Sequence, residues 1–199
     1  MAHGNNVLVG QSGGPPAAIN ASLAGVFSTA SSLGLDVIGM RYGIQGLLDG
    51  RTVRLSHYLS RPLDAKFLRM TPASWLGSCR YKLPDVEQDD APYRQLMDIF
   101  GELGVGSVLY IGGNDSMDTI HKRSLSGDAV GSPIRFVGVP KTIDNDLVGT
   151  DHTPGFGSAA KFIATTMAEV ARDSEVYDIK SVTFVEVLRS DAGWIAGAA

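Results

Sequence analysis

The stretch V-G-V-P-K-T-I-D-N-D, Val137 to Asp146, places polar chemistry directly after a hydrophobic run. The apolar residues Phe136 to Val139 predict a strand of a buried sheet, and Pro140 ends this strand because proline cannot donate to a sheet ladder. The residues that follow are a cation, a hydroxyl group and two carboxylates: Lys141, Thr142, Asp144 and Asp146. Since an open α/β sheet binds its ligand at the carboxyl ends of its strands, the stretch predicts a ligand site.

Two other predicted strands also end in glycine loops that precede helices. Residues 7–9 lead into G-Q-S-G-G-P-P at 10–16 and then into the helix-compatible segment 17–33. Residues 107–111 lead into G-G-N-D-S at 112–116 and then into a polar helix at about 117–125. A glycine loop before a helix exposes backbone N–H groups to an anion, where the helix dipole also favours negative charge.

The rest of the chain continues the alternation of strands and helices. It predicts strands at 36–40, 134–139 and 181–187, helices at 91–103, from 156 onward and at 193–199, a loop at 42–50 and an irregular stretch at 51–90. The stripe Phe156, Ala160, Ile163, Met167 and Val170 predicts a helix that faces a core. The fold class is therefore α/β, with a parallel sheet covered by helices on both faces. The loops 10–16, 111–116 and 140–146 then lie along one rim and describe a pocket for a polyanion.

Composition narrows the function classes. The chain has 199 residues, 44% of them hydrophobic, which is enough to bury a core of one domain or slightly more. A net charge of −4 argues against nucleic acid as a partner but not against phosphate ligands. The single cysteine, Cys79, excludes an internal disulfide framework and suits a reducing compartment. Because no apolar run reaches membrane-spanning length, we expect a cytoplasmic protein without a membrane partner.

Each candidate residue also has a simpler structural interpretation. The loop 10–16 could be a tight turn with nothing bound, and Asp144 and Asp146 could merely build a turn, as Asx residues often do. Asp115 and Ser116 could cap the helix that follows them. A lone arginine such as Arg80 is more often a solvated surface group, and Cys79 is more often a structural residue than a reactive thiol.

Four motifs taken together resemble the phosphofructokinase family. They are G-Q-S-G-G-P at 10–15, L-G-S-C-R at 76–80, G-G-N-D-S at 112–116 and P-K-T-I-D-N-D at 140–146, in the family's order and approximate spacing. The resemblance covers essentially the whole chain and implies a fold of two Rossmann-like lobes with the active site between them. Residues 1–199 would then be the N-terminal donor-phosphate-binding lobe, with the second lobe largely absent, and we expect little or no turnover from them alone.

Two positions indicate which phosphoryl donor the resemblance implies. In the ATP-dependent form of the family, the residues that match Asp115 and Lys141 are typically glycines. A carboxylate at Asp115 adds bulk and negative charge where the α-phosphate of a nucleotide would sit, and Lys141 adds a cation for a compact diphosphate. The sequence therefore resembles the pyrophosphate-dependent type. The alternatives are an ATP-dependent 6-phosphofructokinase and a catalytically dead phosphate-binding fragment or subunit.

The implied reaction is reversible phosphoryl transfer from pyrophosphate to the 1-hydroxyl of fructose 6-phosphate, which gives fructose 1,6-bisphosphate and phosphate. The resemblance implies that Asp144 is the base, that Thr142 orients the reacting groups, and that Lys141 and Arg80 stabilise charge. The residues expected to bind the donor are Gly13, Asp115, Ser116 and Lys141. Full-length members of this type are expected to act as homo-oligomers.

The resemblance also implies a sugar-phosphate site and a Mg²⁺ ion. Besides Thr142 and Asp144, the sugar-phosphate residues would be Leu188, Arg189 and Ser190. There L-R-S-D at 188–191 replaces the usual M-G-R of the family, a departure that favours the phosphate-binding alternative. Mg²⁺ would be held by Asn114, where many members have an aspartate, and by Asp146.

Overall fold

The computed structural model describes residues 4–14, 18–129, 133–187 and 192–198, without the side chains of 122–129. It divides into two compact units, Met1–Pro140 and Lys141–Ala199.

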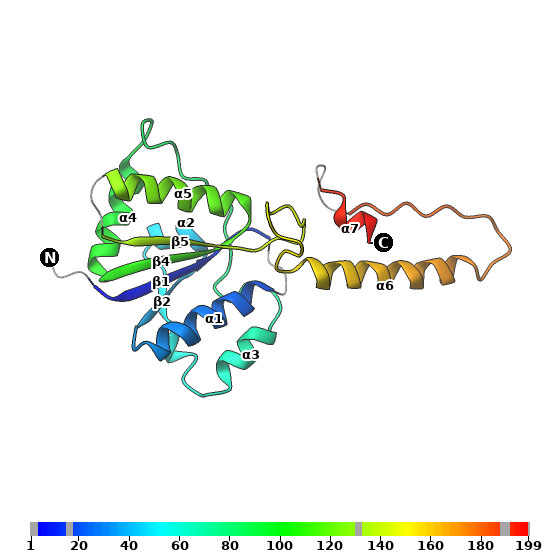
Figure 1. Ribbon diagram of the computed structural model, residues 1–199, viewed down its shortest axis with the longest axis horizontal. Helices are drawn as coiled ribbons and strands as arrows, with labels where there is room; N and C mark the ends of the chain where they lie inside the picture. The colour runs from blue at the N-terminus through cyan, green and yellow to red at the C-terminus, as the bar shows by residue number, and fades with distance from the viewer. Residues whose placement is uncertain (1–3, 15–17, 130–132, 188–191, 199) are drawn as a thin grey trace. The chain divides into compact units, whose positions relative to one another are not determined.

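The first unit is built on a five-stranded sheet (Figure 1). In chain order its strands are β1 (Asn6–Gln11), β2 (Val37–Met40), β3 (Thr52–Arg54), β4 (Val105–Gly112) and β5 (Arg135–Pro140). Their order across the sheet is β3-β2-β1-β4-β5, and all neighbours are parallel except β2 and β3. The predicted parallel sheet is confirmed, with one antiparallel edge strand that the sequence analysis did not predict.

Helices cover both faces of this sheet, as predicted. Figure 1 shows α1 (Ala18–Ser32) and α3 (Asp64–Met70) on one face, and α2 (Gly43–Leu48), α4 (Ala91–Glu102) and α5 (Asn114–Ala129) on the other. Side chains of β1 alternate between the two layers, because successive residues of a strand point to opposite faces. Leu8 packs in the core under α2 and α4, whereas Val7 and Val9 pack in the core under α1 and α3.

The predicted loop at 42–50 and part of the predicted irregular stretch at 51–90 are wrong. They contain α2, β3, a short 3-10 helix at Leu55–His57 and α3, and the longest part without helices or strands is 71–90, with shorter connections at 49–51 and 58–63. Helix α2 forms despite its glycines because Ile44 and Leu47 are buried in the core, so tertiary packing outweighs intrinsic propensity. Gly43 has φ 62°, and a Cβ there would collide with Cys79 Sγ and Tyr110 Oη.

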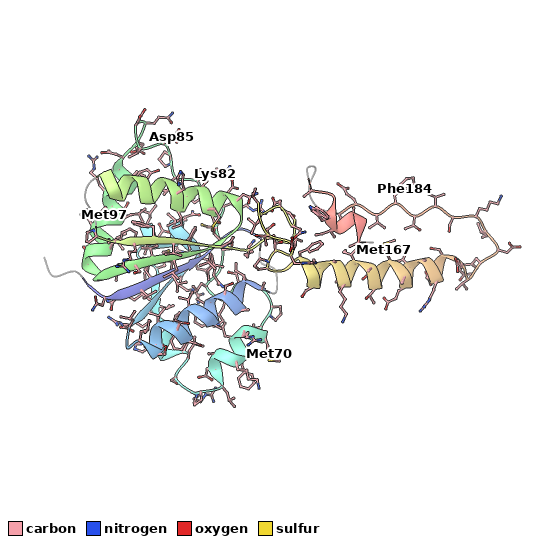
Figure 2. All side chains as sticks on the ribbon, in the orientation of Figure 1. Met70, Lys82, Asp85, Met97, Met167 and Phe184 are labelled. Atoms are coloured by element: carbon pink, nitrogen blue, oxygen red, sulfur yellow. The ribbon has the colours of Figure 1, made fainter. Side chains whose placement is uncertain are left out.

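The second unit contains α6 (Phe156–Ser174) and the short α7 (Trp194–Gly197). The predicted apolar stripe lies on α6, but no residue of α6 is fully buried, so the prediction of a core-facing helix is corrected. Met167 and Val170 line a cavity of about 490 Å³ together with Tyr177 and Ile179 from the segment that follows the helix. Figure 2 shows Met167 on α6 and Phe184 on the extended return segment. Residues 181–187 form no strand, because a strand requires a hydrogen-bonded neighbour.

A buried amide fixes the region where β1 ends. The side chain of Gln11 is fully buried, and its Nε2 donates to Ile19 O at 3.1 Å and to Asn20 Oδ1 at 3.0 Å. Its Oε1 accepts from Ser74 Oγ and from the Leu76 N–H, both at 2.9 Å. One side chain therefore joins the end of β1, the start of α1 and the segment that leads to Arg80.

We predict that Gln11→Leu lowers the free energy of unfolding by at least about 2 kcal/mol, because it leaves several buried polar groups without partners. Gln95→Leu is the matched control, since Gln95 also donates to a carbonyl oxygen but is exposed, and its effect should stay within about 0.5 kcal/mol. Urea denaturation of protein expressed from the complete reading frame measures both. Equal losses in the two variants would contradict the role given to Gln11.

Candidate functional site

The carboxyl ends of three parallel strands meet at one edge of the sheet. Gln11 at the end of β1 pairs with Ile111 of β4, and Gly112 at the end of β4 pairs with Pro140 at the end of β5. The glycine loops that follow β1 and β4 therefore start side by side, as predicted. The third predicted loop, 140–146, starts at Pro140 and continues into the second unit, which begins at Lys141.

A hydroxyl pair couples the two glycine loops. The side chains of Ser12 and Ser116, both buried, hydrogen-bond to each other through their Oγ atoms. A Cβ at Gly112 would collide with Ser116, so this approach requires glycine at position 112. Ser116 was predicted to bind the donor. Its hydroxyl group instead hydrogen-bonds to Ser12, in the loop that was also predicted to bind the donor phosphate.

Gly13 has φ 78°, a conformation that glycine adopts readily. Its N–H was predicted to face the donor phosphate, but in this structure it donates to Cys79 O with an N···O distance of 3.4 Å. Ser78 Oγ donates to Gly13 O at 2.6 Å. Since a bond of 3.4 Å is weak, a phosphate oxygen can replace the Cys79 carbonyl at modest cost.

The first turn of α5 presents a carboxylate next to this loop. The helix begins at Asn114, so Asp115 and Ser116 lie inside the first turn and neither is the N-cap. The side chain of Asp115 is 77% exposed, and its Oδ1 lies 3.3 Å from Nζ of Lys82, whose side chain is 76% exposed. Lys82 was not among the predicted site residues. Its only signal was its position two residues after Arg80.

The segment that carries Arg80 contacts the core of the first unit through the side chain of Cys79. Cys79 Sγ lies 3.8 Å from Tyr110 Oη, which also accepts from the Ile44 N–H. Burial raises the pKa of Tyr110, so its hydroxyl stays protonated. Cys79 is half-buried, whereas Arg80 is exposed. This arrangement fits the structural role for Cys79 and leaves the Arg80 guanidinium accessible to an anion.

In the second unit, the turn after Lys141 is closed by hydroxyl and amide side chains. Thr153 Oγ1 donates to Thr142 O at 2.7 Å, and Thr142 Oγ1 accepts from the Asp144 N–H at 3.0 Å. Asn145, with φ 56°, accepts from the Thr153 N–H through its Oδ1 and donates to Asp151 O. Thr142 and Asn145 therefore supply side-chain bonds that shape this turn.

Lys141 is a buried cation, with only 6% of its surface exposed. Burial lowers the pKa of Lys141, and the negative charge of Asp144 partly opposes this effect. A buried ammonium group is costly unless anions accompany it, so an anionic ligand would add to the stabilisation that Asp144 gives to Lys141.

Three predicted sugar-phosphate residues, Leu188, Arg189 and Ser190, lie outside the described residues. The proposed metal ligands Asn114 and Asp146 both offer oxygen atoms, which Mg²⁺ prefers, although they belong to different units. Within the described ranges, no group of three or more His, Cys, Asp and Glu side chains is placed to hold a metal ion. None of the helices described is both long enough and apolar enough to cross a membrane.

Comparison with known proteins places these motifs in a family. Residues 6–199 match the family model described as Phosphofructokinase. The chain is 44% identical to a pyrophosphate–fructose 6-phosphate 1-phosphotransferase of Xanthomonas campestris pv. campestris, over 98% of this chain and 46% of that protein. It is 40% identical to the solved structure of a pyrophosphate-dependent phosphofructokinase from Marinobacter aquaeolei, with a TM-score of 0.86 over 98% of this chain and 48% of that one.

An ATP-dependent 6-phosphofructokinase of Chloroflexus aggregans is 32% identical, over 93% of this chain and 50% of that protein. The chain thus spans about half the length of the curated relatives that it matches. With the family model matched over nearly all of its residues, the chain belongs to the phosphofructokinase family.

Proposed function

We propose that the protein transfers a phosphoryl group from pyrophosphate to the 1-hydroxyl of fructose 6-phosphate, and that residues 1–199 supply its donor-binding half. The choice of pyrophosphate over ATP rests on the charged residues Asp115 and Lys141, at positions where the ATP-dependent form of the family typically has glycines. Asp115 presents an exposed carboxylate on the first turn of α5, and Lys141 is a buried cation. The resemblance to proteins named for pyrophosphate supports the same choice.

In the proposed reaction, the 1-hydroxyl oxygen of the sugar attacks one phosphorus atom of pyrophosphate. The bond from that phosphorus to the bridging oxygen breaks, phosphate leaves, and Asp144 accepts the hydroxyl proton. Such a transfer depends mainly on positioning and on stabilisation of charge. The Asp144 N–H is already held by Thr142 Oγ1, which fixes the backbone that carries the base.

The positive charge for this step comes from Lys141 and Arg80. Both would stabilise negative charge on the bridging and transferred oxygens. The Gly13 N–H would donate to the donor phosphate once its bond to Cys79 O is exchanged. When bound, Mg²⁺ would neutralise charge on pyrophosphate, with Asn114 and Asp146 as candidate ligands.

The proposal also includes contacts to the sugar phosphate and a location in the cell. Thr142 and Asp144 would also contact the sugar phosphate, together with Leu188, Arg189 and Ser190. We place the protein in the cytoplasm as a homo-oligomer, on the grounds of the family resemblance and of a single free cysteine, Cys79.

We predict that Asp144→Asn lowers kcat by about 100- to 10,000-fold, because the amide cannot accept the hydroxyl proton. Steady-state rates with pyrophosphate as donor measure this on protein from the complete reading frame. Asp173→Asn, on the exposed side of α6, is the control and should leave kcat unchanged. An unchanged rate in Asp144→Asn would favour the alternative of a phosphate-binding subunit without catalytic activity.

The choice of donor is tested by replacing both distinguishing residues. Asp115→Gly combined with Lys141→Gly should lower kcat/KM for pyrophosphate and raise it for ATP, each by at least about tenfold. The single variant Asp115→Gly should give part of the gain with ATP, since the carboxylate is the excluding group. Wild-type protein that prefers ATP would overturn the donor assignment.

The pKa of Lys141 predicts an alkaline limit of activity. Because burial lowers this pKa from the ordinary lysine value of 10.5, Lys141 loses its proton, and with it the charge that the donor needs, at a lower pH than an ordinary lysine. As the pH rises, activity with pyrophosphate should therefore begin to decline before pH 10.5 is reached. Lys141→Arg should remove this decline, because arginine stays protonated throughout the range. The same alkaline profile in both proteins would assign the decline to another group.

A further inference from the structure

An exposed ion pair next to the glycine loop has no role in the mechanism given above. Nζ of Lys82 lies 3.3 Å from Oδ1 of Asp115, and both side chains are more than three-quarters exposed. Lys82, labelled in Figure 2, lies on the segment at 71–90, and Asp115 lies on the first turn of α5. Both residues belong to the first unit.

The backbone around Lys82 is anchored, so the position of this lysine is set by the fold. On one side, Ser78 Oγ donates to Gly13 O at 2.6 Å, and Cys79 Sγ lies 3.8 Å from Tyr110 Oη. On the other side, Leu83 is buried in the core, and Pro84 O accepts from Tyr93 Oη at 2.7 Å. The chain thus holds Lys82 beside the first turn of α5 while its side chain stays in solvent.

Stability does not explain the pair. Exposed ion pairs contribute little to the free energy of unfolding, since water screens the charges and the side chains lose entropy. Asp115 needs no cation for the helix either, because a carboxylate in a first turn already interacts favourably with the helix dipole.

The charge of the donor offers a reason for the pair. Asp115 was assigned the task of excluding a nucleotide, but a bare carboxylate also repels pyrophosphate, which carries several negative charges. An ammonium group at 3.3 Å weakens that repulsion and leaves the bulk of Asp115 in place. Lysine has three N–H donors, so Lys82 can hold Asp115 and still donate to a phosphate oxygen.

We propose that Lys82 is a specificity-determining residue for the phosphoryl donor, which neutralises Asp115 and thereby lets a compact inorganic polyphosphate bind where a nucleotide is excluded. This inference rests on the proposed function and deepens it at the donor site.

The test measures equilibrium binding of pyrophosphate by calorimetry, together with kcat and KM, on protein from the complete reading frame. Lys82→Ala should weaken pyrophosphate binding by at least about fivefold and raise the KM for pyrophosphate. The KM for fructose 6-phosphate should not change. Lys82→Arg should restore binding to within about twofold, because it keeps the charge. Lys66→Ala, an exposed lysine on α3, is the control and should bind pyrophosphate like wild type.

A double-mutant cycle then separates neutralisation of Asp115 from a simple phosphate contact. In an Asp115→Asn background the carboxylate charge is gone while the bulk remains, so Lys82→Ala should cost clearly less binding than it does in wild type. An equal cost in both backgrounds, or an unchanged affinity in Lys82→Ala, would overturn the inference. Wild-type protein that neither binds nor uses pyrophosphate would contradict the proposed function itself, whereas wild-type binding with an indifferent Lys82→Ala contradicts only the role of Lys82.

Discussion

The parallel pairing of β1 with β4 and of β4 with β5 is the constraint on which the candidate site depends. It brings Gln11, Gly112 and Pro140 to one edge of the sheet, although they are far apart in the sequence. The buried amide of Gln11 then fixes the segment at 74–76 to the same edge. The donor loop, the first turn of α5 and the segment that carries Arg80 are therefore positioned by one register and one buried side chain.

The fold could be predicted from the sequence wherever a strand is a continuous apolar run. This holds for β1, β4 and β5, whose ends differ from the predicted bounds by one or two residues. The prediction failed for α2, because its glycines do not favour a helix. The helix forms because Ile44 and Leu47 are buried in the core. The prediction also failed for residues 181–187, since β-forming residues become a strand only when a neighbouring strand supplies hydrogen bonds.

The site could be predicted only as far as residue types carry chemistry at fixed spacing. Asp115, Lys141 and Asp144 stood out because ionic groups follow strand ends. The pairing of Ser12 with Ser116 has no local signal, because it joins residues from different loops. Lys82 was missed for the same reason, since its partner is distant in the sequence and a lone lysine resembles any solvated surface residue.

Lys141 and Lys82 have different electrostatic roles, because one ammonium group is buried and the other is exposed to solvent. Lys141 is buried, so its charge is costly in the absence of an anion and interacts strongly when an anion is present. Lys82 is solvated, so it costs the fold little and weakens the repulsion that Asp115 creates. The bulk of Asp115 excludes a nucleotide, but its negative charge also repels the preferred donor, which is an anion, unless a cation offsets that charge. Specificity of this kind therefore requires a compensating cation beside the excluding group, and Lys82 is held where such a cation is needed.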